Sequence, residues 1–309
     1  MTPPRVSVLV CAIAGVDHLA RCLDLILGQE GITPDEIIAV LDPNLPGSEG
    51  LAARFPSVRI LRNEGQSTPI EIASRALREA TGDIIVLTED HCRPAGDWLR
   101  RLVSAHGDGR AAVGGAVETD HTGSTVTWAF YLVDYYRYMR PATEGPAPAL
   151  TVCNVSYRRE QLEAVRELWR ETFHETAVNA ALVERFGVLW LVPEAEVRTR
   201  RSVTFGDAMY ERYAFGRMFA CNRNRFGGST ARRLAYAALA PLLPAVIMGR
   251  MARRAFRSGA AGAMYLRSFL PLLAMVLAWT WGEWLGYVTN RLPAHVNAAP
   301  ELRAAARGA

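Results

Sequence analysis

The sequence predicts an α/β protein in which helices flank a mostly parallel sheet, followed by a C-terminal hydrophobic helical hairpin. Two observations carry this prediction. Over residues 1–200, short apolar runs rich in β-branched residues alternate with helical patterns. From Leu234 onward, two long apolar segments replace that alternation. The 309 residues are 50% hydrophobic and 21% charged, which suffices for a large core and excludes disordered and disulfide-dependent scaffolds.

The first part of the chain alternates strands with helices. The apolar run at residues 6–13 predicts a strand, and apolar residues three and four apart predict a helix over 17–29. A second buried strand over 36–41 ends at Asp42, and a short third strand is expected over 58–61. Strands that alternate with helices in this way favour a doubly wound sheet.

The same alternation continues to residue 106. A helix is expected over 68–80, because a proline suits its first turn and Thr-Gly ends it. A fourth buried strand over 83–88 runs directly into Glu-Asp-His-Cys-Arg-Pro, and another helix follows near 98–106. Ligands of such sheets bind beyond the carboxyl ends of the strands, so Asp42 and residues 89–91 are the first candidate site residues.

Weaker patterns fill the rest of the first two hundred residues. They predict a strand over 150–157, helices over 160–171 and 176–186, and a last strand over 188–192. The chain is therefore expected to divide into a globular domain at 1–228, a membrane-associated helical region at 229–290 and a disordered tail at 291–309. The tail is rich in Ala, Pro and Arg.

The five cysteines are widely spaced and include no C-x-x-C pair, which predicts neither a zinc site nor a disulfide framework. Reduced thiols in a cytosolic compartment are the simpler interpretation. The N-terminus lacks the charged, apolar and small-residue order of a signal peptide. We therefore expect the first two hundred residues to stay in the cytoplasm.

The strongest local signal is the run Glu89, Asp90 and His91 directly after a buried strand. Carboxylate and imidazole side chains at that position could hold a divalent metal against a diphosphate. The alternative is a helix N-cap, because acidic residues commonly precede helices and Pro94 suits a first turn. The residues alone leave both readings open.

The order of these elements resembles the family 2 glycosyltransferases, and in particular membrane-associated bacterial members, whose nucleotide-sugar-binding fold is called GT-A. The resemblance covers roughly residues 5–225. Its pieces, in the family's order, are VSVLV, EIIAVLD, ASRALREATGDIIVLTEDHCRP, VGGAV, CNVSYRREQLEAV, HET and FGVLWLVPEAEV.

The resemblance implies a set of donor-binding residues. Asp42 matches the acid that contacts the nucleotide base, and Arg75 matches an arginine that helps hold the nucleotide; a turn residue and an exposed helical arginine are the alternatives. Asn154 lies in a matching segment and is expected to contact the substrate or nucleotide. A histidine often found after the last strand is missing, and Arg200 is expected to grip the diphosphate instead.

The resemblance also implies a metal and a base. Glu89, Asp90 and His91 lie where the family has its D-x-D motif, with histidine in the third position, and would hold Mn²⁺ or Mg²⁺. Glu175, preceded by His174, matches the carboxylate that deprotonates the acceptor hydroxyl, so that direct attack inverts the anomeric centre. The alternative is that Glu175 merely starts a helix. Because the Q-x-x-R-W signature is absent, transfer of a single sugar is expected rather than polymerisation.

The uncharged segments at 234–249 and 269–282 are shorter than the roughly 20 residues of a spanning helix, and both contain proline. An in-plane or re-entrant hairpin would keep every arginine on the cytoplasmic side. Two short spanning helices and a buried soluble pair are the alternatives. The arginines that flank the first segment are Arg223, Arg225, Arg232 and Arg233 before it and Arg250, Arg253, Arg254 and Arg257 after it.

Together these features predict a metal-dependent, inverting glycosyltransferase at the cytoplasmic membrane, with its catalytic domain facing the cytoplasm. Its partners would be a nucleotide-diphosphate sugar, a lipid-linked acceptor and the membrane surface. A catalytically degenerate partner subunit and a nucleotidyltransferase are the alternative functions. A nucleic-acid role is not expected, since the arginines gather beside apolar segments rather than among aromatics on a soluble face.

Overall fold

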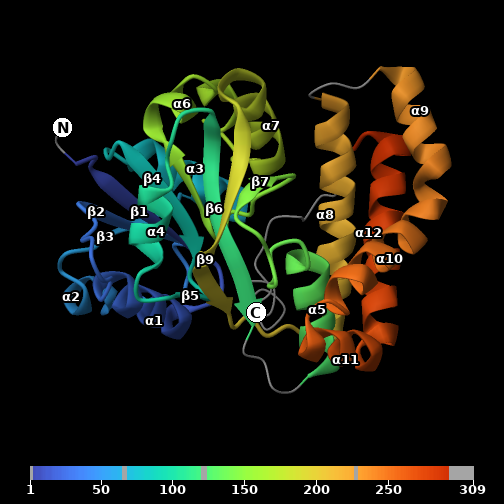
Figure 1. The fold of residues 1–309 in the computed structure, drawn as a ribbon, viewed down its shortest axis with the longest axis horizontal. Helices are drawn as coiled ribbons and strands as arrows, with labels where there is room; N and C mark the ends of the chain where they lie inside the picture. Colours follow the sequence, from blue (N-terminus) through green and yellow to red (C-terminus); the bar gives the residue numbers. More distant parts are fainter. Residues whose placement is uncertain (1–2, 65–67, 120–123, 226–228, 292–309) are drawn as a thin grey trace. The chain divides into compact units, whose positions relative to one another are not determined.

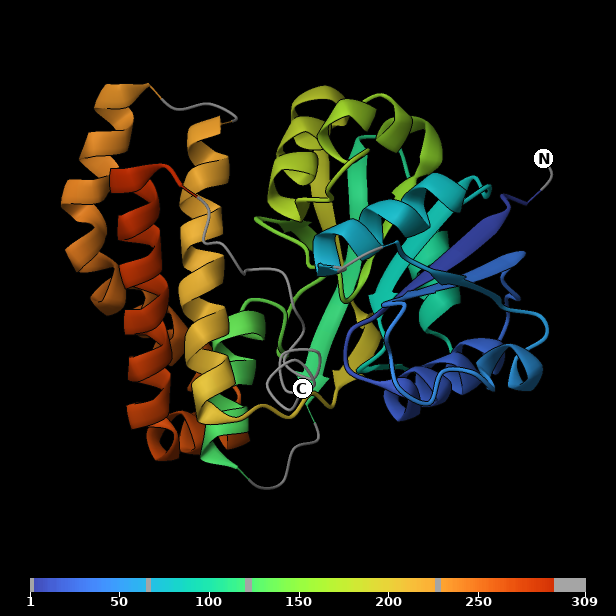
Figure 2. The same ribbon diagram turned by 180° about the vertical axis from the view of Figure 1, so that it is seen from behind.

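The computed structural model describes residues 3–64, 68–119, 124–225 and 229–291. They form two compact units (Figures 1 and 2). The first unit lies within residues 1–120 and 142–201, and the second within 121–141 and 202–296. The division expected from the sequence, with its boundary at residue 228, remains a prediction. The expected disordered tail lies outside the described residues apart from Arg291.

The N-terminal part of the first unit is a parallel sheet. Strand β1 pairs in parallel with β2 and β4, and β2 pairs in parallel with β3. Helices lie on both faces of the sheet (Figures 1 and 2). The predicted alternation of strands and helices is confirmed here to within a few residues at each end, and the short helix α2 (Leu51–Arg54) was not predicted. The elements are β1 (Val6–Ala12), α1 (Val16–Leu27), β2 (Glu36–Leu41), α2 (Leu51–Arg54), β3 (Arg59–Arg62), α3 (Pro69–Glu79), β4 (Ile84–Glu89) and α4 (Trp98–Ser104).

Local sequence explains why α3 forms where it does. The Thr68 hydroxyl accepts a hydrogen bond from the Glu71 backbone, while the Glu71 carboxylate accepts one from the Thr68 backbone. Pro69 occupies the first turn, where its missing N–H would have no partner in any case. The apolar face of α3, which includes Ile72 and Ala76, is buried in the core with residues of β1 and β2.

The rest of the first unit makes the sheet mixed. Strand β8 pairs antiparallel with both β4 and β6, and β6 pairs in parallel with β9. Strands β5 and β7 pair antiparallel with β9. The sheet order is β3-β2-β1-β4-β8-β6-β9-β5, with β7 beside β9. These elements are β5 (Cys92–Pro94), β6 (Arg110–Thr119), β7 (Gly145–Ala147), β8 (Val155–Arg158), α6 (Arg159–Glu163), a 3₁₀ turn (Arg166–Leu168), α7 (Glu175–Phe186) and β9 (Val188–Thr199).

Three predicted elements have different bounds in this region. The strand expected over 150–157 begins only at Val155, because residues 151–154 form a turn closed by the Asn154 N–H and the Thr151 carbonyl. The helix expected over 160–171 is interrupted, and a 3₁₀ turn follows α6. Strand β9 extends to Thr199 because it pairs with β6 and β5 beyond the predicted end.

The second unit is helical. Its largest packed pair is α8 against α12, and glycines let the two backbones approach closely. A Cβ added to Gly282 would lie 2.0 Å from the Tyr213 carbonyl oxygen, and one added to Gly216 would lie 2.1 Å from that of Trp279. The helices are α5 (Thr125–Tyr135), α8 (Phe205–Arg225), α9 (Thr230–Leu239), a 3₁₀ turn (Ala240–Leu242), α10 (Leu243–Ala255), α11 (Gly259–Arg267) and α12 (Phe269–Thr289).

Two C-terminal helices are longer than the sequence suggested. The helical stretch Thr230–Ala255 has 26 residues and α12 has 21, and both are apolar enough to cross a membrane by length and composition alone. The uncharged runs are short, but the helices that contain them are long enough to span, so length does not separate an in-plane hairpin from two spanning helices. The helical stretch continues past Pro241 and Pro244 through the 3₁₀ turn between α9 and α10, because each proline lies in a first turn of its helical segment.

Candidate functional site

The carboxyl ends of β2 and β4 carry the acidic residues that the sequence predicted. Asp42 directly follows β2 and is buried. Its carboxylate accepts the Asn44 N–H at 2.8 Å, and its carbonyl accepts the Leu45 N–H at 3.1 Å. This local turn fixes the orientation of the Asp42 side chain at the strand end.

Asp90 fastens the loop that follows β1. Its carboxylate accepts the Ile13 N–H at 3.0 Å and the Ala14 N–H at 2.9 Å. Its own N–H donates to the Cys11 carbonyl. Burial, followed by the charges of Glu89 and Asp90, raises the pKa of the Cys11 thiol well above its ordinary value. Asp90 therefore holds the backbone at the end of β1 and places its neighbours on either side of it.

Those two neighbours, Glu89 and His91, face one another. The Glu89 Oε2 lies 3.5 Å from the His91 Nε2, and it accepts the Cys153 thiol at 3.1 Å. The Cys153 Sγ lies 4.0 Å from the same imidazole nitrogen. The antiparallel register of β4 and β8 explains this contact, since Leu87 pairs with Val155 and Cys153 falls opposite Glu89.

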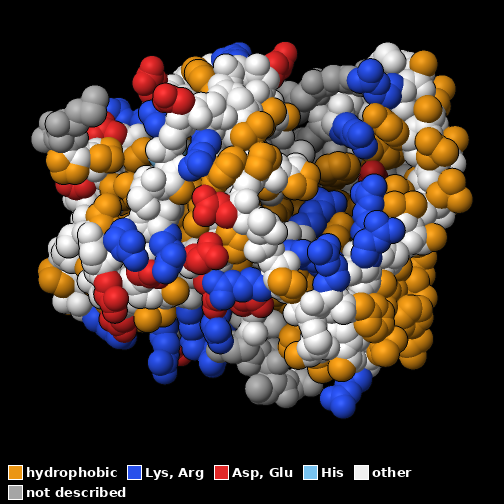
Figure 3. All heavy atoms as spheres, viewed as in Figure 1, with side chains coloured by type: hydrophobic (Ala, Val, Ile, Leu, Met, Phe, Trp, Pro, Cys, Tyr) orange, Lys and Arg blue, Asp and Glu red, His pale blue; other side chains and the backbone are white. Residues whose placement is uncertain are grey.

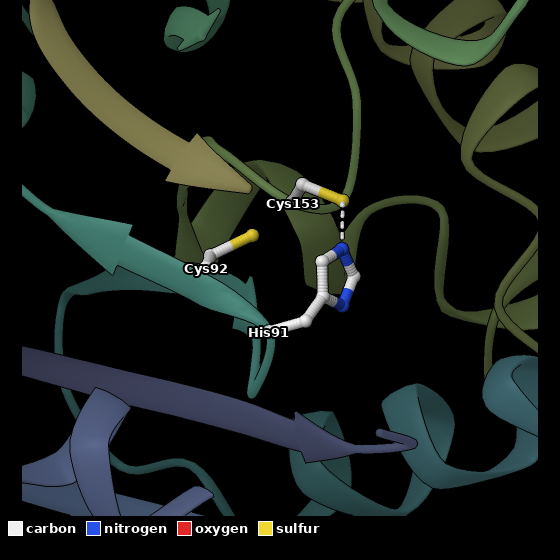
Figure 4. Close-up of side chains that lie close together, drawn as sticks. All are labelled: His91, Cys92 and Cys153. Carbon is white, nitrogen blue, oxygen red and sulfur yellow. Dashed lines mark hydrogen bonds between the residues drawn. The ribbon is translucent and has the colours of Figure 1, made fainter. Parts of the chain in front are cut away.

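A second cysteine joins the group. Atoms of His91, Cys92 and Cys153 that can bind a metal lie within 4.8 Å of one another, and all three residues are buried. Figure 4 shows the Cys153 sulfur beside the imidazole ring and the Cys92 sulfur directed toward the same space. The cysteine spacing predicted no zinc site, whereas the sheet brings two thiols that are distant in sequence close to one imidazole.

The predicted base, Glu175, contacts the residue that precedes Cys153. Glu175 is the first residue of α7, and its Oε2 accepts the Val152 N–H at 2.6 Å. Val152 precedes Cys153, so the turn at 151–154 joins the Glu175 carboxylate to the Glu89 carboxylate through two consecutive residues. Glu175 and His174, the N-cap residue of α7, are both half-buried.

Comparison with known proteins identifies the family. A model described as Glycosyl transferase family 2 matches residues 7–166, more than half of the chain. The chain belongs to glycosyl transferase family 2. No curated protein matches the sequence.

Solved structures show the same fold as this family 2 chain. A mannosyltransferase, PcManGT from Pyrobaculum calidifontis in complex with GDP-Man and Mn²⁺, has a TM-score of 0.56 and 16% identity over 91% of this chain and 87% of that chain. GalNAc-T7 with UDP, GalNAc and Mn²⁺ has a TM-score of 0.51 and 16% identity over 66% of this chain and 45% of that chain. A mycobacterial protein has a TM-score of 0.51 and 17% identity over 73% of this chain and 76% of that chain. The GT-A fold expected from the sequence is thus confirmed.

Arg200 lies next to the motif of this family 2 chain through its backbone. Its N–H donates to the His91 carbonyl at 3.0 Å, and its side chain is exposed. Sequence reasoning missed Arg93, which pairs in register with Arg198 across β5 and β9. Burial, followed by the charge of Arg93, lowers the pKa of His18. Cationic side chains therefore accompany the Glu89–His91 motif at this edge of the sheet.

Two predicted donor contacts are engaged elsewhere. Arg75 forms an ion pair with Glu79 at 3.2 Å within α3. Asn154 is fully buried, and its Oδ1 accepts the Trp98 Nε1–H at 2.8 Å. Its amide nitrogen donates to the Ala116 and Ala195 carbonyls at 2.9 and 2.7 Å. Because both amide hydrogens are used and the side chain is inaccessible, the expected contact of Asn154 with the donor does not fit; it braces β6, β9 and α4.

The side chains of Glu89 and His91 could hold a divalent ion between them. Two ligands of one ion at about 2.0–2.2 Å lie about 3 Å apart, close to the separation of Glu89 Oε2 and His91 Nε2. Glu89 and His91 are therefore the direct ligand candidates. The Asp90 carboxylate already accepts two backbone N–H groups, so its fit is that of a residue that positions the other two.

Proposed function

We propose that this chain transfers a single sugar from a nucleoside-diphosphate sugar to an acceptor hydroxyl, with inversion at the anomeric carbon. The observation that carries the proposal is the connected set of Glu175, the turn at 151–154 and the Glu89–His91 pair at one edge of the sheet. Membership in family 2 supports the reaction class. The GDP-Man, UDP and Mn²⁺ of the structural relatives support the donor class and the metal.

The donor would be held at the carboxyl ends of β2 and β4. Asp42 would accept hydrogen bonds from the base, and the exposed guanidinium of Arg200 would pair with the diphosphate. Arg75 would have to exchange its ion pair with Glu79 for a contact to the nucleotide. Mn²⁺ or Mg²⁺ held by Glu89 and His91 would neutralise negative charge on the departing diphosphate.

Glu175 would act as the general base. Its hydrogen bond from the Val152 N–H orients one carboxylate oxygen, and a carboxylate has a second oxygen that can accept the proton of an acceptor hydroxyl. Attack from the side opposite the diphosphate inverts the anomeric centre. His174, directly before it, is the second candidate for proton transfer.

We further propose that the acceptor is lipid-linked and that the second unit binds the cytoplasmic face of the membrane. Large apolar side chains are exposed along both long C-terminal helices, and Figure 3 shows apolar surface over this part of the chain. The helices could lie in the interface as a hairpin that keeps all arginines on one side, or cross the bilayer. The exposed residues are Leu234, Leu239, Leu242 and Val246 on the first helix and Phe269, Leu270, Leu277, Trp281 and Val288 on α12.

Calorimetric titration of the detergent-solubilised chain with UDP, GDP and dTDP tests the donor site. We expect one diphosphate to bind in the presence of Mn²⁺ and to bind at least tenfold more weakly without it. Asp42→Asn should weaken that binding while it keeps the acceptor for the Asn44 N–H. The control Asp24→Asn removes only an exposed ion pair with Arg54 and should bind as the wild type does.

The rival functions give other results. A folded chain that binds no diphosphate would contradict the proposal and favour a degenerate partner subunit. Consumption of a nucleoside triphosphate with release of pyrophosphate would indicate a nucleotidyltransferase.

A further inference from the structure

We propose that Glu89, His91, Cys92 and Cys153 together form a thiolate-containing metal site that binds Zn²⁺ in preference to Mn²⁺ or Mg²⁺. The proposal deepens the proposed function at the same site, and it rests on that function only for its consequence for the donor. The metal-binding claim itself stands on the positions of these four side chains.

The distances match a tetrahedral site. Ligands of one zinc ion, with bonds of about 2.3 Å to sulfur and about 2.0–2.1 Å to nitrogen or oxygen, lie about 3.3–3.8 Å apart. The Cys153 Sγ lies 3.1 Å from Glu89 Oε2 and 4.0 Å from His91 Nε2, and those two atoms are 3.5 Å apart. The Cys92 sulfur lies within 4.8 Å of the other sulfur and the imidazole. The group within 4.8 Å consists of His91, Cys92 and Cys153, and Glu89 joins it through its contacts with His91 and Cys153, so side-chain shifts would have to bring the four ligand atoms onto one ion.

The chemical type of the ligand atoms favours one metal ion over another. Thiolates are soft ligands that favour Zn²⁺, whereas Mn²⁺ and Mg²⁺ prefer sites built from oxygen. A zinc ion would displace the protons of both thiols to solvent. The two sulfurs come from different elements, β5 and the turn before β8, and both are buried. Nothing in the donor role of Glu89 and His91 requires either thiol.

Occupancy by zinc would have a consequence for the transferase. Four protein ligands complete a tetrahedral site, and a closed site leaves no position for phosphate oxygens. Glu89 and His91 would then be unavailable to the ion that accompanies the donor. Zinc would therefore compete with Mn²⁺ and inhibit diphosphate binding.

Cobalt(II) is the probe, because it takes the geometry of zinc and reports thiolate ligands by a sulfur-to-metal charge-transfer band. We expect titration of the reduced, full-length chain with CoCl₂ to produce that band at one equivalent, and ZnCl₂ to abolish it. Cys92→Ser and Cys153→Ser should each weaken the band, and the double variant should lack it. Cys221→Ser, which changes a thiol of the second unit, is the matched control and should keep it.

Each result decides the matter. Absence of the charge-transfer band in the folded wild type, or its persistence in the double variant, would overturn the proposal. The wild-type spectrum alone can overturn the proposal, so the proposal remains testable even if a variant fails to fold. The donor titration is a separate readout: diphosphate binding without the band would leave the transferase standing, and the band without diphosphate binding would leave the metal site standing.

Discussion

The two units differ in what their surfaces expose. In the first unit, large exposed hydrophobic side chains are scattered on two helices and at the start of β9, namely Leu25, Leu27, Val183 and Val188. In the second unit they follow both long C-terminal helices along their length. Scattered apolar side chains are normal on a water-soluble domain, whereas a continuous apolar surface marks contact with a membrane or another protein. The first unit thus has the surface of a domain that folds in water, whereas the second has apolar helix faces that we propose enter the membrane.

The two units also differ in how their interiors pack. The first buries β-branched and aromatic side chains between a sheet and its helices, with Trp169, Tyr157 and Ile38 among the largest fully buried. The second brings α8 and α12 together over small residues, including the Gly282-x-x-x-Gly286 pair. Close packing over glycines is typical of helices in membranes, where apolar side chains gain little from mutual burial.

The largest effect should come from making the exposed face of α12 polar. Leu270→Ser with Leu277→Ser removes two side chains that are 76% and 49% exposed, so the folded unit loses no core contact of comparable size. If both leucines enter the membrane interface, each substitution removes about 1.5–3 kcal/mol of binding free energy. Binding to anionic phosphatidylglycerol vesicles should then fall by about 100-fold or more. Vesicle flotation after detergent removal measures the loss.

The matched control makes the same change in the first unit. Leu27→Ser with Val183→Ser alters two side chains that are 45% and 40% exposed there, and vesicle binding should be unchanged. If the α12 variant floats as well as the wild type, this face of α12 does not bind the membrane, and the contrast between the two units fails.

A smaller effect is expected from breaking the glycine contact. Gly282→Leu places a side chain against the Tyr213 carbonyl, a backbone atom that cannot rotate away. Overpacking of this kind costs about 1–3 kcal/mol or more, so helical circular dichroism should show a lower unfolding temperature in detergent. Gly249→Leu, where nothing lies within 4 Å of an added Cβ, should melt close to the wild type. Equal melting of the two variants would contradict close packing of α8 on α12.

The predictable part of the fold is the part with strong local signals. Apolar runs and the capping residues of α3 sufficed to predict β1 to β4 and the helices α1 and α3. Strand β6 escaped prediction because its centre is Gly114 and Gly115, which have no β propensity. Tertiary packing explains the second glycine: a Cβ on Gly115 would lie 1.7 Å from the Ala195 carbonyl oxygen.

In the candidate site, too, the residues with a local sequence signal could be predicted and those that depend on strand pairing could not. Asp42, Glu89 and His91 could be predicted as candidates because they lie at or just after the ends of buried strands, and the carboxyl ends of parallel strands share one edge. Cys153 could not, because its contact with Glu89 depends on the antiparallel pairing of β8 with β4. Asn154 shows the converse, since its place in a matching segment does not reveal that its side chain points into the sheet.

Replacement of Glu175 by Gln tests the proposed chemistry most directly. The substitution keeps an oxygen for the Val152 N–H and removes the base. With polyprenyl phosphate in vesicles as acceptor and the donor selected by calorimetry, we expect kcat to fall by about 10²–10⁴ while the donor binds as before. Glu171→Gln, at a side chain 78% exposed beside Arg170, should turn over normally. Wild-type turnover in Glu175→Gln would contradict the account.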